Sequence, residues 1–182
     1  MVMKVVLQPV TRFLDNGTLI HLAEDISKEF GAINVTVASS IELDKAHIQL
    51  AFDKQRKQWD SSKLLEWLLM KFKRNKETKI LALFDIDAYS TAFDFVFGEA
   101  YYKGRMAVVY LARLRQEFYG LKPDYPLFYE RLVKESIHEL GHVFGLVHCN
   151  NPRCVMHFSI SLHYVDTKDR SLCQRCIRKF IH

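Results

Sequence analysis

HELGHVFGLVH, residues 138–148, places three histidines at spacings of four and six residues. On a helix, residues four apart project from the same face, with about 6 Å between their Cβ atoms. The imidazoles of His138 and His142 can therefore both bind one zinc ion, with zinc–nitrogen distances of about 2.0–2.1 Å. Gly145 can adopt the left-handed conformation that ends a helix. The chain can then turn and bring His148 to the same ion as a third ligand.

Glu139 follows the first histidine and is rotated from it by about 100° around the helix axis. We expect its carboxylate to miss the ion but to reach a water molecule beside it, as a general base. Three neutral nitrogen ligands leave one open corner on a tetrahedral zinc, which is typical of a catalytic site. Zinc lowers the pKa of bound water toward roughly 7. The pattern therefore predicts hydrolysis of an amide.

The motif lies on an amphipathic helix that we expect over about residues 126–144. Pro126 suits the first helical turn. Apolar side chains then recur at helical spacing, at Val133, Ile137, Leu140 and Phe144. The alternative, a helix whose surface histidines bind nothing, does not account for the additional glycine and third histidine at the required spacing.

Upstream of this helix, the apolar pattern predicts alternating strands and helices. Gly31 can end the first helix, and Asp60 or Ser61 can cap the second. The β-α-β-α-β order predicts a mostly parallel sheet with right-handed crossovers. Two further strands follow, and we expect one of them to run antiparallel at the sheet edge. The expected strands cover residues 4–8, 33–37, 79–86, 93–97 and 106–111, and the helical stripes cover 19–30 and 64–72.

The strand at 93–97 carries Phe93, Phe95 and Phe97. We expect this aromatic stripe to belong to the core. The alternative is an edge strand beside the active-site helix that binds an extended peptide by strand addition.

Length and composition limit the class of protein. The chain has 182 residues, of which 49% are hydrophobic and 26% charged, with 7 glycines and 4 prolines. This composition excludes collagen-like and disordered classes. No apolar run approaches the roughly 20 residues that span a bilayer, and residues 1–14 lack the pattern of a secretion signal. We therefore expect one domain, a cytoplasmic location and no membrane partner.

The chain is mildly basic, with 26 Lys and Arg, 21 Asp and Glu, and a formal net charge of +5. Two basic clusters, at 54–57 and 71–74, alternate with acidic and apolar positions. A nucleic-acid interface needs a more concentrated basic surface. We therefore expect no nucleic-acid partner, and the sequence leaves the oligomeric state open.

All four cysteines lie in the last 34 residues, and two of them form a C-x-x-C pair. In a cytoplasmic chain, clustered cysteines at this spacing more often hold a metal than form disulfides. A pair of disulfides and a redox-active C-x-x-C pair are the alternatives.

Residues 138–156, HELGHVFGLVHCNNPRCVM, followed by CQRC at 173–176, resemble the archaemetzincins, a family of zinc metallopeptidases in the metzincin clan. The extended zinc motif with a methionine downstream is the metzincin pattern. The resemblance also includes residues 97–114, and it covers the first 90 residues only by architecture. It implies a metzincin-like α/β fold and a peptide or protein substrate. Aminopeptidase and endopeptidase activity both remain open.

By this resemblance, His138, His142 and His148 bind the catalytic zinc and Glu139 is the base. Met156 then forms the floor beneath the ligands. The alternative is a zinc-stabilised module that binds a protein or a nucleic acid and has lost hydrolysis. The intact Glu139 argues against this alternative, because a scaffold needs no base there.

The cysteines predict a second, closed zinc site, formed by Cys149, Cys154, Cys173 and Cys176. Four thiolates at about 2.3 Å complete the coordination of zinc, so this ion is structural. The neighbours His148 and Cys149 are expected to point to different ions. Within one domain, 1–182, residues 1–148 then form the α/β part and residues 149–182 a small zinc-stabilised C-terminal part. The sequence thus predicts two zinc ions per chain.

Overall fold

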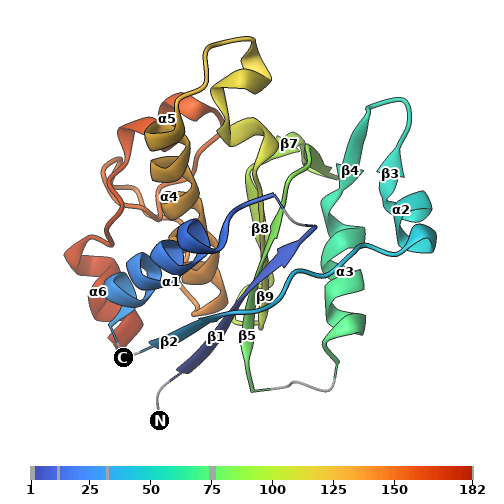
Figure 1. Cartoon of the computed structure of the whole chain (residues 1–182). Helices are drawn as coiled ribbons and strands as arrows, with labels where there is room; N and C mark the ends of the chain where they lie inside the picture. The colour runs from blue at the N-terminus through green and yellow to red at the C-terminus, as the bar shows by residue number, and fades with distance from the viewer. Residues whose placement is uncertain (1–2, 12, 32, 74–76, 182) are drawn as a thin grey trace.

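A five-stranded sheet forms the centre of the fold (Figure 1). The computed structural model describes residues 3–11, 13–31, 33–73 and 77–181. The strand order is β2-β1-β5-β9-β8. The first four strands are mutually parallel, and β8 pairs antiparallel with β9 at the edge. This confirms the predicted mixed sheet with its antiparallel edge strand. The strands are β1 (Met3–Val10), β2 (Ile33–Val37), β5 (Lys79–Phe84), β8 (Gly98–Ala100) and β9 (Met106–Tyr110).

Two helices, α1 (Asn16–Phe30) and α4 (Tyr125–Val143), cover one face of this sheet. The Asp15 side chain caps α1 by accepting a hydrogen bond from the Thr18 amide. Gly31 ends the helix with a φ of 69°, as its position predicts. The apolar stripes of both helices are buried against alternate residues of the central strands, among them Leu81 and Leu83.

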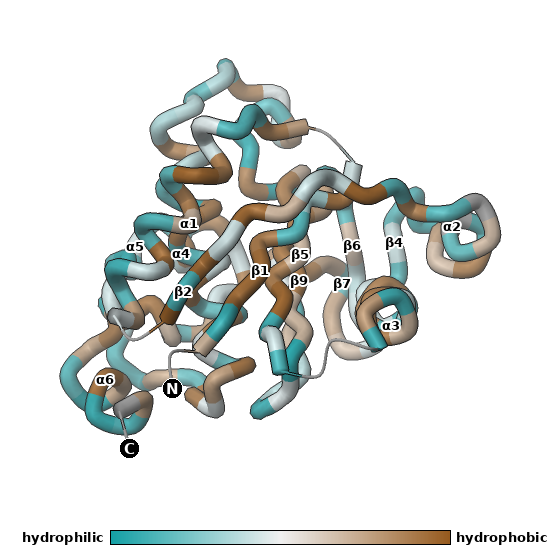
Figure 2. Tube along the Cα trace, turned by 60° about the horizontal axis from the view of Figure 1, so that its bottom comes forward, coloured by the Kyte–Doolittle hydropathy of each residue, from teal (hydrophilic) through white to brown (hydrophobic). Residues whose placement is uncertain are grey.

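The opposite face of the sheet is covered by α3 (Ser61–Lys71), whose N-cap is Asp60. Its leucines pack against the other set of alternate residues, including Ile80, Ala82 and Phe84 of β5. Because β5 is buried on both faces, it reads as a continuous apolar run. Figure 2 shows this hydrophobic character along β1 and β5.

A second, four-stranded sheet lies beside α3, and the sequence analysis did not anticipate it. Its order is β3-β4-β6-β7, and the short helix α2 (Lys45–Ala51) precedes it. The predicted strand at 93–97 is divided: β7 ends at Val96 in this sheet, and β8 begins at Gly98 in the main sheet. Strands of two to four residues carry too little alternation to be recognised from sequence. The strands are β3 (Phe52–Asp53), β4 (Gln58–Asp60), β6 (Ala88–Ser90) and β7 (Phe93–Val96).

The C-terminal segment packs on α4 and shares its core. Val155, Val165 and Leu172 belong to the same buried cluster as α1 and α4. The Arg131 guanidinium of α4 pairs with Asp166 of the short helix α5 (Leu162–Thr167), with 2.7 Å from Nε to Oδ1.

The remaining helices are η1 (Ala112–Leu114), η2 (Gln116–Tyr119) and α6 (Gln174–Ile181). Across the described residues, no helix combines the length and the apolar character needed to cross a bilayer.

The start of α4 yields a stability prediction. Asp124 Oδ1 accepts a hydrogen bond of 3.0 Å from the Leu127 amide as the N-cap of this helix. We expect Asp124→Ala to lower the free energy of unfolding by about 1 kcal/mol, measured by urea denaturation. Asp124→Asn keeps the acceptor and is the matched control. Equal stability of the alanine variant and the native protein would show that this cap contributes nothing.

Candidate metal centres

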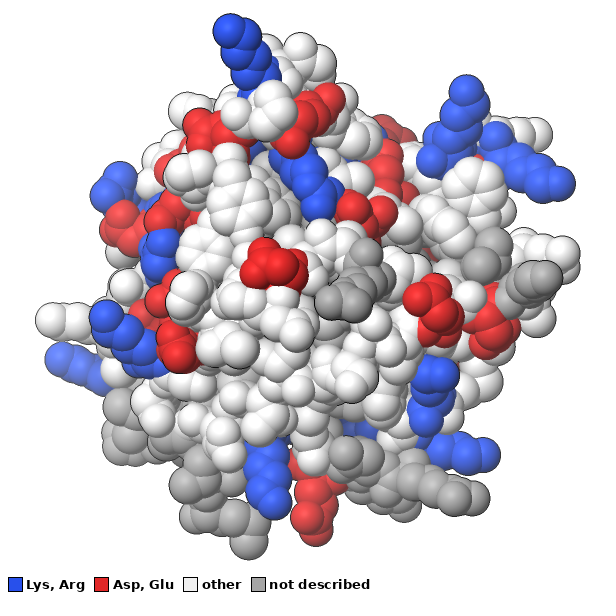
Figure 3. Space-filling model, viewed as in Figure 1, with Lys and Arg blue, Asp and Glu red and all other residues white. Residues whose placement is uncertain are grey.

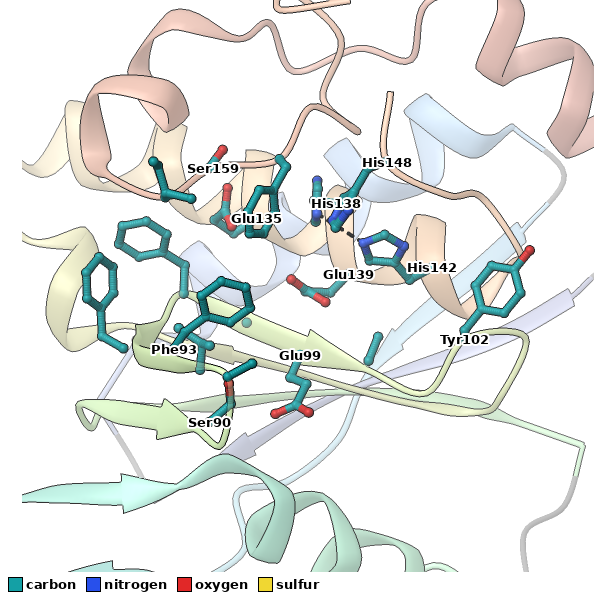
Figure 4. Close-up of a pocket in the computed structure, with 18 of the residues that line it drawn as sticks. Ser90, Phe93, Glu99, Tyr102, Glu135, His138, Glu139, His142, His148 and Ser159 are labelled. Atoms are coloured by element: carbon teal, nitrogen blue, oxygen red, sulfur yellow. Dashed lines mark hydrogen bonds between the residues drawn. The ribbon is translucent and has the colours of Figure 1, made fainter. Parts of the chain in front are cut away.

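The C-terminal end of α4 brings the three motif histidines together (Figure 4). His138 and His142 lie one turn apart on the helix. Gly145, with a φ of 91°, reverses the chain just beyond the helix end, and His148 returns toward the other two. One ligand nitrogen from each ring lies within 4.8 Å of the others. The structure therefore shows the convergence that the motif predicts.

Two backbone carbonyls orient the helical imidazoles. Nδ1 of His138 donates to the Val155 carbonyl, and Nδ1 of His142 donates to the Leu146 carbonyl, both at 2.8 Å. Because a carbonyl only accepts, Nδ1 carries the proton in each neutral ring and Nε2 is a bare acceptor. These two Nε2 atoms face each other at 3.1 Å. Two acceptors at this distance repel each other unless a cation lies between them.

The distance between these Nε2 atoms also fits zinc. Two nitrogens on one tetrahedral zinc, each at about 2.05 Å, lie roughly 3.3 Å apart. Burial lowers the pKa of the His138 and His142 imidazoles, and it lowers that of His148 to about 4. All three rings are therefore neutral at pH 7, as metal ligands must be. The donor set thus fits zinc in both spacing and protonation.

Glu139 lies between the histidines and the edge of the main sheet, and its side chain is buried. A Cβ atom at Gly98 of β8 would lie only 2.6 Å from Glu139 Cγ. Burial, followed by the carboxylates of Glu135 and Glu99 among other groups, raises the pKa of Glu139 well above its usual value. A carboxyl group with a raised pKa can both accept and release a proton near neutral pH.

Met156 lies beneath α4 and is fully buried. A Cβ atom at Gly141 would lie 2.4 Å from Met156 Sδ, so the thioether occupies the space that a larger residue would fill. This places Met156 directly under the helix turn that carries His142. The sequence analysis did not single out Gly141, although a glycine inside a helix costs about 1 kcal/mol and so indicates a packing requirement.

A cavity of about 520 Å³ opens beside the histidines. Residues 90–100 of the two sheets form one wall, and α4 with residues 158–160 forms the other. Of the predicted core stripe, Phe97 is buried, whereas the Phe93 side chain is 46% exposed and lines the cavity. Phe93 and Phe158 meet there, with ring centroids 5.6 Å apart.

The four cysteines form a second cluster behind the first. Their sulfur atoms lie within 4.8 Å of one another. The Cys149–Cys173 and Cys154–Cys176 sulfur pairs are both 3.8 Å apart. Ligands at about 2.3 Å around a tetrahedral zinc are separated by roughly 3.8 Å, whereas a disulfide requires about 2.05 Å. The four thiols are free, so the alternative of two disulfides is wrong.

Arg175 contacts this cluster, and the sequence analysis did not single it out. Its guanidinium donates to Cys149 Sγ at 3.2 Å. This hydrogen bond raises the pKa of the Arg175 guanidinium, which therefore places a positive charge beside the four sulfurs. His148 and Cys149 belong to different clusters, as predicted.

Comparisons with known proteins show which family this chain resembles over nearly its whole length. Residues 11–182 match peptidase family M54. An archaemetzincin from Methanocaldococcus jannaschii is 39% identical over 180 residues, covering 98% of this chain and 93% of that protein. The crystal structure of an archaemetzincin from Methanopyrus kandleri is 35% identical, with a TM-score of 0.83, covering 98% of this chain and 93% of that one. The crystal structure of a zinc-dependent peptidase from Methanocorpusculum labreanum is 32% identical, with a TM-score of 0.85. The match covers 98% of this chain and 100% of that one.

The contact between β8 and α4 yields a second prediction. In Gly98→Ala, the added methyl would meet Glu139 Cγ at 2.6 Å and the Val108 carbonyl oxygen at 2.7 Å. The backbone oxygen cannot move aside, so Glu139 must shift. A displacement of about 1 Å typically costs about a hundredfold in rate, and we expect a loss of this size in peptide hydrolysis.

The control for Gly98→Ala is the zinc content, which should not change because the three histidines are not touched. A variant that hydrolyses peptides at the native rate would show that the close approach of β8 does not position Glu139.

Proposed function

The chain belongs to peptidase family M54, and on this basis we propose which residues carry out its zinc-dependent hydrolysis of peptide bonds. His138, His142 and His148 hold the catalytic zinc, the first two through Nε2. The observation that carries this assignment is the 3.1 Å approach of two bare Nε2 acceptors, which is close to the separation of two nitrogen ligands on one zinc ion. Gly145 supplies the chain reversal that brings in the third ligand, and Met156 supports the turn from below.

Glu139 is the general base in this proposal. Zinc supplies a Lewis acid that polarises the peptide carbonyl and makes a water molecule more acidic. The Glu139 carboxylate takes a proton from the attacking water and delivers it to the amide nitrogen, which then leaves as an amine. The raised pKa of Glu139 suits both transfers. The exposed edge of β8 offers backbone groups along which an extended substrate can lie.

We assign the second zinc to Cys149, Cys154, Cys173 and Cys176, which gives two ions per chain. The 3.8 Å sulfur separations support a closed, four-thiolate site. This site holds the C-terminal part, residues 149–182, against α4. Because that part shares one buried core with the α/β part, 1–148, we propose a single domain for the whole chain, 1–182.

We propose peptides or proteins as substrates, and a cytoplasmic location, where free thiols persist. A nucleic-acid partner is not part of this proposal. On the face drawn in Figure 3, Lys and Arg side chains are interspersed with Asp and Glu. The alternative function, a zinc-stabilised binding module, is not favoured by membership in a peptidase family.

The role of Glu139 can be tested with an isosteric substitution. We expect Glu139→Gln to retain zinc at the histidines but to lower the rate of peptide hydrolysis by about 10²–10⁴-fold, since the amide cannot accept the proton. The measurement is a screen of peptides with free and blocked N-termini, which also separates aminopeptidase from endopeptidase activity. Native turnover by the variant would remove Glu139 from the mechanism.

The count of two zinc ions yields a further prediction. We expect native protein to contain two zinc ions per chain by elemental analysis and Cys173→Ser to contain one. The variant should also melt at a temperature more than about 10 °C lower, because metal binding contributes to folding free energy. One ion in the native protein, or an unchanged melting temperature in the variant, would contradict the structural role.

A further inference from the structure

A buried ion pair lies at the wall of the cavity beside the histidines, and the proposed mechanism does not use it. Lys168 Nζ lies 2.8 Å from Glu135 Oε1, and the two side chains are 0% and 4% exposed. Beyond this ion pair, neither atom has a hydrogen-bond partner among the described residues. Glu135 lines the cavity, one helical turn before His138. The Glu135 carboxylate can therefore accept a further hydrogen bond from a polar group in the cavity.

Ser159 supplies a second polar group on the same wall. Its Oγ atom is buried and has no hydrogen-bond partner among the described residues. Figure 4 shows the Ser159 hydroxyl and the Glu135 carboxylate on the same side of the cavity, with Phe93 opposite. A hydroxyl both donates and accepts, whereas a carboxylate only accepts. Together these two groups complement a ligand hydroxyl, which also donates and accepts.

The rest of the cavity near this wall is aromatic. Phe93 and Phe158 contact each other in a tilted arrangement, and the Phe158 ring lies 4.7 Å from that of His148. Tilted and edge-to-face contacts are the geometry in which a further aromatic ring packs favourably. An aromatic side chain that carries a hydroxyl group therefore fits both the aromatic and the polar side chains of the cavity.

A cationic side chain fits this wall less well. Lys168 already balances the charge of Glu135, and a second cation on the same carboxylate would lie close to the Lys168 ammonium, within about 5 Å. Three other acids line the cavity: Glu139 serves as the base, and Asp94 and Glu99 lie on the opposite wall, among residues 90–100. Asp94 is 95% exposed and contacts Arg56, and Figure 4 shows Glu99 pointing away from the three imidazoles.

We propose that this cavity is a side-chain specificity pocket in which Glu135 and Ser159 select a substrate tyrosine by its phenol hydroxyl. The phenol donates to the Glu135 carboxylate and accepts from the Ser159 hydroxyl, while its ring packs against Phe93 and Phe158. Lys168 is the positioning residue that holds the Glu135 carboxylate. The inference rests on the proposed peptidase function, because it names the side chain that the site accepts.

The test is a binding experiment that does not depend on turnover. Two blocked hexapeptides, Gly-Gly-Ala-Tyr-Ala-Gly and its Phe counterpart, differ by one oxygen atom. Their dissociation constants are measured by calorimetry on the zinc-loaded Glu139→Gln variant. A hydrogen-bonded phenol should make the Tyr peptide bind about tenfold more tightly than the Phe peptide. Equal binding, or tighter binding of the corresponding Lys peptide, would overturn the proposal.

Variants in the same background assign the effect to its residues. Ser159→Ala should reduce the Tyr-to-Phe ratio to about threefold or less, whereas Ser62→Ala, on the exposed face of α3, should keep it. Glu135→Gln leaves Lys168 without a counter-charge and can unfold the protein, so it is combined with Lys168→Met. A ratio that survives in both Ser159→Ala and the double variant would overturn the assignment.

The test of the tyrosine pocket and the test of peptide hydrolysis can fail independently of each other. Failure of the native zinc-loaded protein to hydrolyse any peptide would refute the proposed function, whatever the binding ratio. An absent Tyr preference in the binding experiment would refute the pocket assignment, even if peptides are hydrolysed.

Discussion

Two hydrogen bonds from imidazole Nδ1 atoms to backbone carbonyls set the chemistry of this protein. They fix the tautomers of His138 and His142 and direct both Nε2 atoms to one point. One of the carbonyls belongs to Val155, which directly follows Cys154 of the second cluster, and the Val155 amide in turn donates to the Ser171 carbonyl. The cysteine cluster therefore helps to orient the His138 imidazole.

Two buried glutamates on α4 place like charges beside the cavity. Glu135 and Glu139 lie one turn apart on the face that meets the cavity, where like charges at this spacing repel each other. Lys168, from just beyond α5, neutralises Glu135 and is the buried cation nearest to this pair among the described residues. A buried ion pair of this kind is by itself weak evidence for stability, but removing one partner leaves an uncompensated buried charge. The C-terminal segment thus contributes charge as well as carbonyl orientation.

Much of this arrangement could be predicted from the sequence, because it depends on local spacing. The periodicity of α1 and α4, the apolar run of β5 and the chain reversal at Gly145 are all short-range signals. The small sheet could not be predicted, since its strands are held by pairing rather than by their own pattern. Lys168 and Ser159 likewise lie far along the chain from α4, and only tertiary packing brings them to Glu135 and the cavity.

The central claim is that three imidazoles share one zinc ion and leave a coordination position free. An anomalous difference map at the zinc edge, from crystals grown with zinc, tests it most directly. The account predicts one peak bonded to the imidazoles of His138, His142 and His148 at about 2.0–2.1 Å, with no fourth protein ligand, and a separate peak among the four cysteine sulfurs. Rings that diverge from the first peak, or a fourth side chain bonded to that zinc, would contradict it.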